Sequence, residues 1–417
     1  MRIQRDIYLN RLILRKHNGL IKVITGVRRC GKTYLLFELF YQHLRDSGVD
    51  DAHIIRLSLD DIANREYREP LRLYHYVKEQ IKDEKMYYVL LDEVQFVAEF
   101  EDVLNGFLHL PNVDTYVSGS NAKFLSKDVI TEFRGRGDEV RIYPLTFREF
   151  MQAFDGTREE AWDEYVQHGG MPALPGMHTP EEKRNYLKNL FTETYLKDII
   201  ERNHIRNEEE LAELLDLIAS QIGSPVNPKK ISDTFKSVKN VSVHPDTIKN
   251  YLDYLSDAFL IEKVKRYDVK GKKYIGTPMK YYFTDVGLRN ARLNFRQIEQ
   301  THLMENIIYN ELRVRGYDVD AGVVEINSQD ASGKNIKPQL EVDFVCNQMP
   351  ARIYIQSVLS MPDREKRMQE QRPFGYISDS FQKVIIAKDV IGTWYSDEGV
   401  LMLNLFDFLL NPNSLRR

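Results

Sequence analysis

The chain has 417 residues, of which 42% are apolar and 29% charged, and its formal net charge is −4. This length predicts two or three domains. Charged residues interrupt the first twenty residues, and no apolar run approaches the ~20 residues of a bilayer-spanning helix. We therefore expect neither a signal peptide nor a membrane partner. Its two cysteines, Cys30 and Cys346, exclude a disulfide framework and a cysteine-type zinc site, which favours a cytoplasmic protein.

Residues 21–33, IKVITGVRRCGKT, contain the most specific motif of the chain. Gly26, Gly31, Lys32 and Thr33 match the pattern G-x-x-x-x-G-K-[ST] at every fixed position. The glycines let backbone N–H groups turn towards a phosphate chain, the lysine adds charge for the β- and γ-phosphates, and the threonine hydroxyl suits Mg²⁺. We therefore predict a site for ATP and Mg²⁺. The expected nucleotide-binding residues are Gly26, Val27, Arg28, Arg29, Cys30, Gly31, Lys32, Thr33 and Tyr34. Of these, Lys32 is in addition a catalytic candidate and Thr33 a metal ligand.

The flanking sequence supports this motif. An apolar and basic segment over residues 8–14 predicts a helix that packs on the sheet, the β-branched residues of 21–27 predict a buried strand, and apolar residues recur at helical spacing over 34–44. Cys30 precedes this last helix, whose dipole is expected to lower the pKa of the thiol. Oxidation of Cys30 would then obstruct phosphate binding, although the position also simply needs a small residue.

A carboxylate pair is expected to complete the site. Strand 53–59 and helix 71–82 are followed by an apolar strand over residues 86–91, which ends in Asp92 and Glu93. Carboxylates at the end of a central parallel strand lie beside the phosphate-binding loop. We expect Asp92 to be a metal ligand that holds Mg²⁺ through water, and Glu93 to be the catalytic group that orients the attacking water.

The next predicted strand, residues 114–117, runs into SGSN. Ser118 and Ser120 are candidates to sense the γ-phosphate, with Asn121 as an alternative, and Ser118 is our catalytic candidate. Ser120 or Asn121 equally suits the N-cap of a following helix.

Two arginines, Arg134 and Arg136, precede a fifth strand expected over residues 139–143. An arginine here can be presented to the γ-phosphate of a neighbouring subunit, where it would stabilise the transition state. Both are therefore catalytic candidates for an arginine finger, and this role would require a homo-oligomer. Two surface arginines without a catalytic role are the alternative.

These motifs resemble the AAA-type ATPase domain of a broad prokaryotic family of P-loop ATPases, related to the STAND and archaeal-type ATPases. The likeness continues through YVQHGGMPALP, ETYLKDII, FTDVGLRNA, LMENIIYNEL and EVDFV. The resemblance implies an α/β P-loop NTPase domain with a five-stranded parallel sheet, a helical and winged-helix middle, and an α/β restriction-endonuclease-like C-terminal domain of unknown function. We place the AAA-type domain at 1–150, the helical lid or linker at 151–224, the winged-helix domain at 225–285 and the nuclease-like domain at 286–417.

The middle of the chain changes from acidic to basic. Residues 225–280 contain 12 Lys and Arg against 6 Asp and Glu, an excess of +6 within a chain of net charge −4. Helices over 229–238 and 245–258, with strands over 260–267 and 273–275, predict a helix-turn-helix with a basic wing. A DNA or a protein partner fits this module, and the candidate DNA contacts are Thr247, Lys249, Asn250, Lys270, Lys272 and Lys273.

The C-terminal segment resembles the PD-(D/E)xK nuclease fold, with Glu305 on a helix, Asp343 on a strand, and Gln356-Ser357-Val358 where E-x-K is expected. Metal-dependent cleavage needs two strand carboxylates and a lysine. Gln356 is neutral and Val358 is apolar, so we expect an inactive nuclease unless Lys366 or Lys383 takes the place of the lysine.

Two functions remain open from the sequence. The first is a Mg²⁺-dependent ATPase, converting ATP and water to ADP and phosphate and moving the winged-helix and nuclease-like domains, with DNA as a candidate substrate. The second is a STAND-like signalling switch or adaptor that oligomerises with ATP and binds protein partners.

Overall fold

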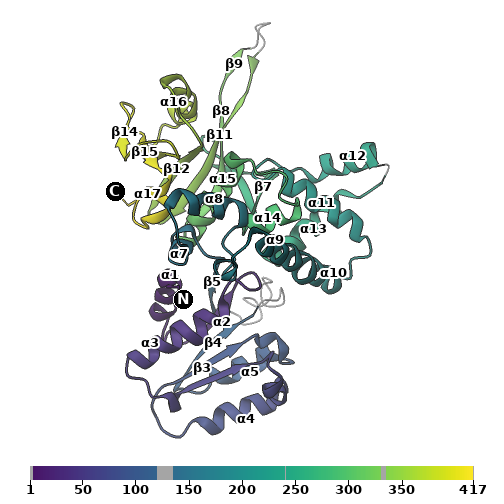
Figure 1. Cartoon of the computed structure of the whole chain (residues 1–417), viewed down its shortest axis with the longest axis vertical. Helices are drawn as coiled ribbons and strands as arrows, with labels where there is room; N and C mark the ends of the chain where they lie inside the picture. The colour runs from purple at the N-terminus through teal and green to yellow at the C-terminus, as the bar shows by residue number, and fades with distance from the viewer. Residues whose placement is uncertain (1–2, 120–134, 240, 330–334, 417) are drawn as a thin grey trace. The chain divides into compact units, whose positions relative to one another are not determined.

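The computed structural model describes residues 3–119, 135–239, 241–329 and 335–416. The chain divides into two compact units, one comprising residues 1–145 with 257–259 and the other comprising 146–256 with 260–417 (Figure 1). Among the described residues, no helix combines the length and the apolarity needed to span a bilayer.

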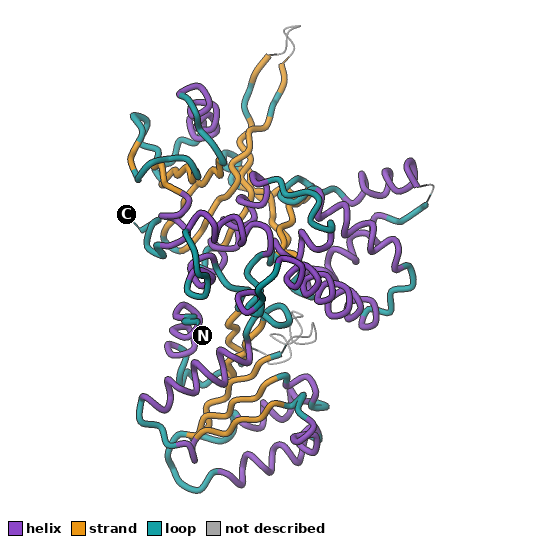
Figure 2. The backbone as a smooth tube through the Cα atoms, in the orientation of Figure 1, coloured by secondary structure: helices purple, strands orange, loops and turns teal. Residues whose placement is uncertain are grey.

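The first unit is built on a parallel sheet in the order β2-β3-β4-β1-β5. Its strands are β1 (Ile21–Thr25), β2 (Ile54–Ser58), β3 (Tyr87–Asp92), β4 (Val113–Ser118) and β5 (Gly137–Arg141). Every neighbouring pair in this sheet is parallel, and Figure 2 shows its strands side by side with helices next to them. The predicted five-stranded parallel sheet is therefore confirmed.

Helices cover both faces of this sheet because the strand residues are apolar on both sides. On one face, α4 (Pro70–Gln80) and α5 (Phe100–Phe107) bury Leu73 and Phe107 against alternate strand residues such as Val23 and Val89. On the other face, the helix after the P-loop runs through α2 (Lys32–Tyr34), the π-helical η1 (Leu35–Phe40) and α3 (Tyr41–Asp46), and α1 (Asp6–Leu14) packs on η1.

The second unit begins with helices. Those before the sheet are α7 (Phe147–Met151), α8 (Arg158–His168), α9 (Pro180–Asn189), the π-helical η7 (Leu190–Leu196), α10 (Lys197–Arg202), α11 (Glu208–Ser220), α12 (Pro228–Lys239) and α13 (Pro245–Asp257). Gly169, with φ +75°, reverses the chain after α8. Asp285 accepts hydrogen bonds there from the N–H groups of Gly170 at 2.7 Å and of Leu288 at 2.9 Å, which joins the HGG segment to the start of α14 (Val286–Arg292).

An eight-stranded mixed sheet forms the rest of the second unit, in the order β14-β15-β13-β12-β11-β8-β6-β7. Its strands are β6 (Ile261–Asp268), β7 (Lys273–Phe283), β8 (Asp318–Glu325), β11 (Gln339–Gln348), β12 (Ala351–Val358), β13 (Gln382–Ala387), β14 (Trp394–Tyr395) and β15 (Leu401–Asn404). The helix α15 (Gln300–Val314) packs on β7, β8, β11 and β12. The two strands expected as the wing, β6 and β7, thus belong to the same sheet as the C-terminal strands, because β6 pairs in parallel with β8.

Beyond this sheet, β8 and β11 extend towards the short strands β9 (Ser328–Gln329) and β10 (Asn335–Ile336) (Figure 1). Three helical segments complete the unit: α16 (Arg364–Gln371), η8 (Arg372–Tyr376) and α17 (Leu405–Leu410). Phe374 of η8 is buried in an apolar cluster with Tyr354 of β12 and Ile385 of β13, so η8 closes one face of the sheet.

Candidate nucleotide-binding site

The backbone of the predicted P-loop has the conformation that its glycines permit. Gly26 has a φ of +143°, Gly31 has +99°, and Arg29 between them also has a positive φ of +62°. A Cβ atom on Gly26 would lie 2.3 Å from the carbonyl oxygen of Ile142, which is far inside van der Waals contact. The glycine at position 26 is therefore required both by its backbone angle and by the segment that follows β5.

Lys32 lies at the start of α2 with only 4% of its surface exposed. Its ammonium donates to the carbonyl oxygens of Gly26 at 3.0 Å and Val27 at 3.2 Å. The charge is thus held inside the loop, at the position where a phosphate chain would accept hydrogen bonds from it.

Three side chains join the P-loop to the acidic strand end. The Thr33 hydroxyl donates to one carboxylate oxygen of Asp92 at 2.6 Å, and the Ser118 hydroxyl donates to the other. Burial raises the pKa of Asp92, whereas the two hydroxyl donors favour its ionised form. The ends of β3 and β4 and the start of α2 therefore meet at one point.

Glu93 follows Asp92 in the left-handed region, with φ 52°. Its backbone N–H lies 3.4 Å from the Ser118 hydroxyl oxygen, and its carboxylate accepts a hydrogen bond from the side-chain amide of Gln95. Non-glycine residues with positive φ carry a local conformational cost and cluster at functional sites.

Arg5 is a buried residue of the site that the sequence analysis did not select. Its guanidinium donates to the carbonyl oxygens of Cys30 at 2.7 Å, Tyr143 at 2.6 Å and Pro144 at 3.3 Å. It also lies over the Tyr8 ring, 4.6 Å from the centroid. Arg5 thus connects the N-terminal segment, the P-loop and the chain that follows β5. No local sequence pattern predicts contacts between residues so far apart in the chain.

The remaining P-loop positions differ in exposure. Val27 and Cys30 are buried, Arg28 is half-buried and Arg29 is exposed. The Tyr34 hydroxyl donates to the carbonyl oxygen of Ile3 at 3.3 Å, which is a second link to the N-terminal segment.

The expected lowering of the Cys30 pKa is wrong. Burial raises the pKa of this thiol, and the effect outweighs the nearby charges of Lys32 and Arg5. The thiol lies among protein atoms, 3.9 Å from the carbonyl oxygen of Ile142. Because a protonated thiol is a poor nucleophile, the basis for peroxide sensitivity at this position is removed.

Of the two arginine candidates, one lies outside the described residues and the other lies away from the P-loop of its own chain. Arg134, like Ser120 and Asn121, lies outside the described residues. Arg136 is exposed at the start of β5, and its carbonyl accepts from the N–H of Ile21 at the start of β1. The five residues of β1 then separate it from Gly26, a distance of about 16 Å at ~3.3 Å per residue.

The donor set fits Mg²⁺. The Thr33 hydroxyl oxygen is a hard ligand, and the Asp92 carboxylate lies 2.6 Å from it, so Thr33 could bind Mg²⁺ directly and Asp92 through a water ligand of the same ion. No cluster of three or more His, Cys, Asp or Glu side chains suited to a metal occurs in the described part of the chain.

The nuclease-like residues of the second unit surround a lysine that the sequence analysis did not consider. Lys280 of β7, 2% exposed, lies 3.2 Å from a carboxylate oxygen of Glu305 and also pairs with Glu341. Burial opposes its charge, but Glu305 and Glu341 outweigh burial and raise the pKa of Lys280. Lys366 instead pairs with Glu370 at 2.6 Å, and Lys383 donates to the carbonyl oxygen of Ile377 at 3.0 Å.

Asp343 and Gln356 lie together next to this ion pair. The Gln356 side-chain amide donates to Asp343 at 3.3 Å, and the N–H of Ser357 donates to its other oxygen at 2.7 Å. Burial raises the pKa of Asp343 well above its usual range, and Glu305 adds to this effect. Val358 is buried in the apolar core of the sheet.

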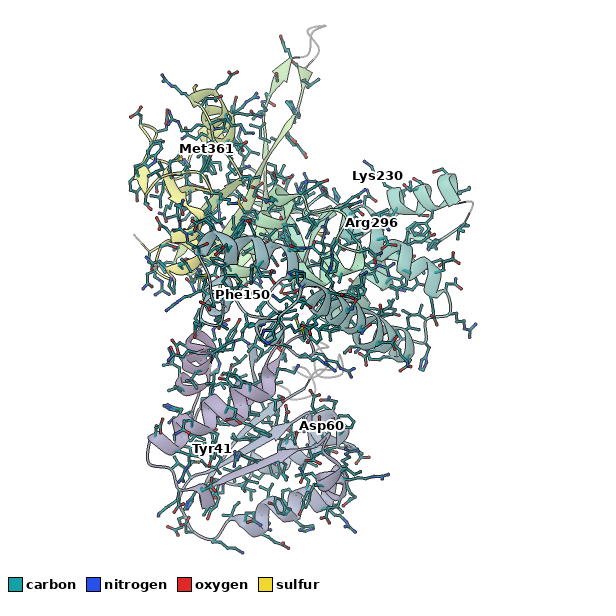
Figure 3. All side chains as sticks on the ribbon, in the orientation of Figure 1. Tyr41, Asp60, Phe150, Lys230, Arg296 and Met361 are labelled. Atoms are coloured by element: carbon teal, nitrogen blue, oxygen red, sulfur yellow. The ribbon has the colours of Figure 1, made fainter. Side chains whose placement is uncertain are left out.

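The candidate DNA contacts of the middle segment lie on two elements. Lys249 and Asn250 are exposed on α13, and Thr247 is half-buried there. Lys270, Lys272 and Lys273 are exposed at the turn between β6 and β7. Lys230, labelled in Figure 3, is an exposed cation of α12.

Two family models match successive parts of the chain. Residues 18–151 match the model of an AAA domain, and residues 159–299 match a domain of unknown function, DUF8612. An uncharacterized protein of Haemophilus influenzae is 31% identical over 418 residues, covering 98% of both chains. The uncharacterized protein MJ1544 of Methanocaldococcus jannaschii is 31% identical over 331 residues, covering 76% of this chain and 70% of that protein.

Among solved structures, the Aeropyrum pernix ORC2 protein, in ADPNP and ADP complexes, covers 69% of this chain and 90% of its own length. The sequence identity is 13% and the TM-score is 0.35. A likeness this distant carries no functional argument.

Proposed function

We propose that this chain, which belongs to the same family as the Haemophilus influenzae protein and carries an N-terminal AAA domain, hydrolyses ATP in a Mg²⁺-dependent reaction. The observation that carries the proposal is the hydrogen-bonded group of Thr33, Asp92 and Ser118, which joins the P-loop to the ends of β3 and β4. Phosphoryl transfer depends mainly on positioning and charge stabilisation, and both requirements are met by groups held in this way.

Each residue has a defined part in this proposal. Lys32 exchanges its two loop carbonyls for the β- and γ-phosphates, and Thr33 and Asp92 hold Mg²⁺, which when bound neutralises phosphate charge. Glu93 orients the attacking water, and Ser118 fixes the carboxylate of Asp92. Arg134 or Arg136 would act on the nucleotide of a neighbouring subunit.

The second unit would respond to the nucleotide state. We assign α12 and α13, with the turn between β6 and β7 as the wing, to a module that binds DNA or a protein, and the strands around Asp343 to a nuclease-like domain without cleavage activity. The strands β6 and β7 continue the sheet of that nuclease-like domain. The excess of +6 over residues 225–280 supports a DNA partner.

Two variants test the proposal in the full-length protein. Lys32→Ala is expected to abolish binding of a fluorescent ATP analogue. Glu93→Gln should bind it normally while phosphate release falls by about 100-fold or more. Lys85→Ala and Glu84→Gln, two exposed changes before β3 at the opposite end of the strand, should leave both measurements unchanged. Unchanged turnover in Glu93→Gln would remove the assigned role of this carboxylate.

One observation favours the signalling switch as a second candidate. The Glu93 carboxylate is engaged by the Gln95 amide, which would slow basal turnover until that bond is released. Under this alternative, ATP binding itself drives assembly. Measuring particle size by light scattering and phosphate release for the native protein with ATP separates the two, because ATP-dependent assembly at negligible native turnover supports the switch.

A further inference from the structure

A row of cations and aromatic rings crosses part of the eight-stranded sheet. The Lys265 ammonium lies 5.4 Å from the Tyr274 ring centroid, and the Tyr274 and Tyr267 rings are 5.4 Å apart. The Arg352 guanidinium lies 5.2 Å from the Tyr267 ring and 5.6 Å from that of Phe381. We call these five residues the cation–ring row; they come from β6, β7 and β12 and from the segment before β13.

Two of the three rings of the cation–ring row are exposed to solvent. Tyr274 is 59% exposed and Phe381 is 40% exposed, whereas Tyr267 is half-buried against the apolar core. A neighbouring ring, Tyr376, is 42% exposed and has the Lys270 ammonium 5.7 Å from its centroid. Exposed rings grouped together on one face indicate a binding surface.

The charge beside the row is strongly positive. Residues 263–273 contain six cations and a single carboxylate, Asp268. That carboxylate accepts from the N–H of Gly271 at 2.9 Å, within its own turn. Asp379 accepts from the Tyr354 hydroxyl at 2.7 Å, and Asp320 from the Tyr274 hydroxyl at 3.2 Å. These hydrogen bonds hold the carboxylates in place without removing their charge, and Lys263 pairs with Asp253 at 3.4 Å. The excess positive charge of residues 263–273 is therefore carried by the other cations, which are Lys265, Arg266 and the three lysines of the turn.

We propose that the cation–ring row binds single-stranded nucleic acid. Unpaired bases would stack on Tyr274 and Phe381, and the phosphates between them would pair with Lys265, Arg352 and the lysines of the turn. Stacking needs exposed base faces, so a duplex, whose bases are already stacked, uses only the cations. An acidic protein segment would likewise use the cations and gain little from the rings. The proposal is independent of ATP hydrolysis and deepens the proposed DNA partner of residues 225–280, because it names the single strand as the form that is bound.

The test uses the full-length protein with EDTA and without nucleotide, and follows the fluorescence anisotropy of a labelled 15-nucleotide single strand and of its duplex. The single strand should bind more tightly, and Tyr274→Ala and Phe381→Ala should each weaken it by at least about fivefold. Tyr274→Phe retains the ring and should bind like the native protein, which separates lost stacking from lost folding. Lys265→Ala should lower the slope of log affinity against log salt by about 1.

Trp394→Ala is the matched control. This ring on β14 is 38% exposed and has the Arg367 guanidinium 5.5 Å from its centroid, but it lies outside the row. Binding should be unaffected by its removal. Absence of binding to the single strand would overturn the proposal, as would equal affinity for the duplex. Ring variants that bind normally while Lys265→Ala does not would also overturn it, because they would indicate a general anion surface.

Discussion

The buried guanidinium of Arg5 connects the N-terminal segment to the P-loop. Its three acceptors are backbone carbonyl oxygens, of Cys30 on one side and of Tyr143 and Pro144 on the other. The second pair follows β5, in the segment whose Ile142 carbonyl faces Gly26. The geometry of the phosphate-binding loop thus depends on a residue that would not touch the nucleotide.

We predict that Arg5→Met raises the KM for ATP and lowers the stability of the first unit by about 2–4 kcal/mol, because buried carbonyls lose charged donors. ATP titration of turnover and urea unfolding measure the two effects. Arg15→Met, at the C-terminal end of α1, removes a partly exposed pair with Asp138 and a hydrogen bond to the carbonyl oxygen of Arg11, and should cost about 1 kcal/mol or less. Native stability and KM in Arg5→Met would contradict the positioning role.

In the second unit, the buried ammonium of Lys280 lies among carboxylates. We predict that Lys280→Met lowers the free energy of unfolding by about 3–5 kcal/mol at neutral pH, because Glu305, Glu341 and Asp343 are left without their cation. Folding raises the pKa of Asp343, mainly through burial, so this carboxyl group binds a proton more readily in the folded state. The loss should therefore diminish as the pH falls, and it should be largest above the folded pKa of Asp343.

Urea unfolding between pH 8 and pH 5 checks this prediction. Lys366→Met is the control, since its partner Glu370 lies on the same surface helix, α16. A Lys280→Met protein as stable as Lys366→Met, or a loss that grows with acidity, would show that the ammonium does not neutralise this group.

At the scale of elements, the sequence predicts what is local. The strands and the P-loop helix follow from β-branched runs and from apolar spacing, and the five-stranded parallel sheet follows from the family resemblance. The candidate site residues follow from the P-loop motif, for Lys32 and Thr33, and from the acidic end of a strand, for Asp92 and Glu93. Pairing between distant segments has no such signal. Arg266 of β6 pairs with Ala321 of β8, 55 residues later, so the eight-stranded sheet could not be foreseen from the wing pattern.

The difference between local and long-range signals also explains why Arg5 and Lys280 were not predicted and why the prediction for Cys30 was wrong. The contacts of Arg5 and Lys280 span 25 residues or more, and neither residue stands in a motif. The rule that a helix start lowers a thiol pKa failed for Cys30 because burial, a tertiary property, had the larger effect.

A partly buried ion pair links two neighbouring helices, α8 and α9. Lys183 donates to Glu164 at 2.6 Å, and the Nδ1 atom of His168 lies 3.0 Å from the same carboxylate oxygen. Burial alone would raise the pKa of Glu164, but His168 and Lys183 outweigh it and lower the pKa to about 2. Because the folded pKa lies below the unfolded value, this carboxylate stabilises the fold above that unfolded value and loses its contribution as the pH falls towards 2.

We predict that Glu164→Gln costs up to about 3 kcal/mol at pH 7, from a shift of roughly 2.5 pKa units at ~1.36 kcal/mol each. The difference from the native protein should shrink between about pH 5 and pH 2. Urea unfolding across this range measures it, with the exposed Glu181→Gln on α9 as control. A difference that stays constant with pH would mean that the loss is one of packing rather than of charge.

At the scale of the whole molecule, the position of Arg136 bears on assembly. It lies at the start of edge strand β5, and its guanidinium reaches Asn105 at 3.5 Å. The length of β1, about 16 Å, separates it from the P-loop of its own chain and exceeds the reach of an arginine side chain. A catalytic role for Arg136 therefore requires a second subunit.

We predict that Arg136→Ala and Lys32→Ala are each deficient in hydrolysis, and that mixing them in equal amounts restores it. In a head-to-tail assembly, an intact P-loop then faces an intact arginine at about a quarter of the interfaces. Phosphate release from the mixture measures this, and Arg72→Ala on the surface helix α4 is the control with native turnover. Native turnover in Arg136→Ala, or a mixture no more active than its parts, would leave Arg134 as the remaining arginine to be tested in the same pairing.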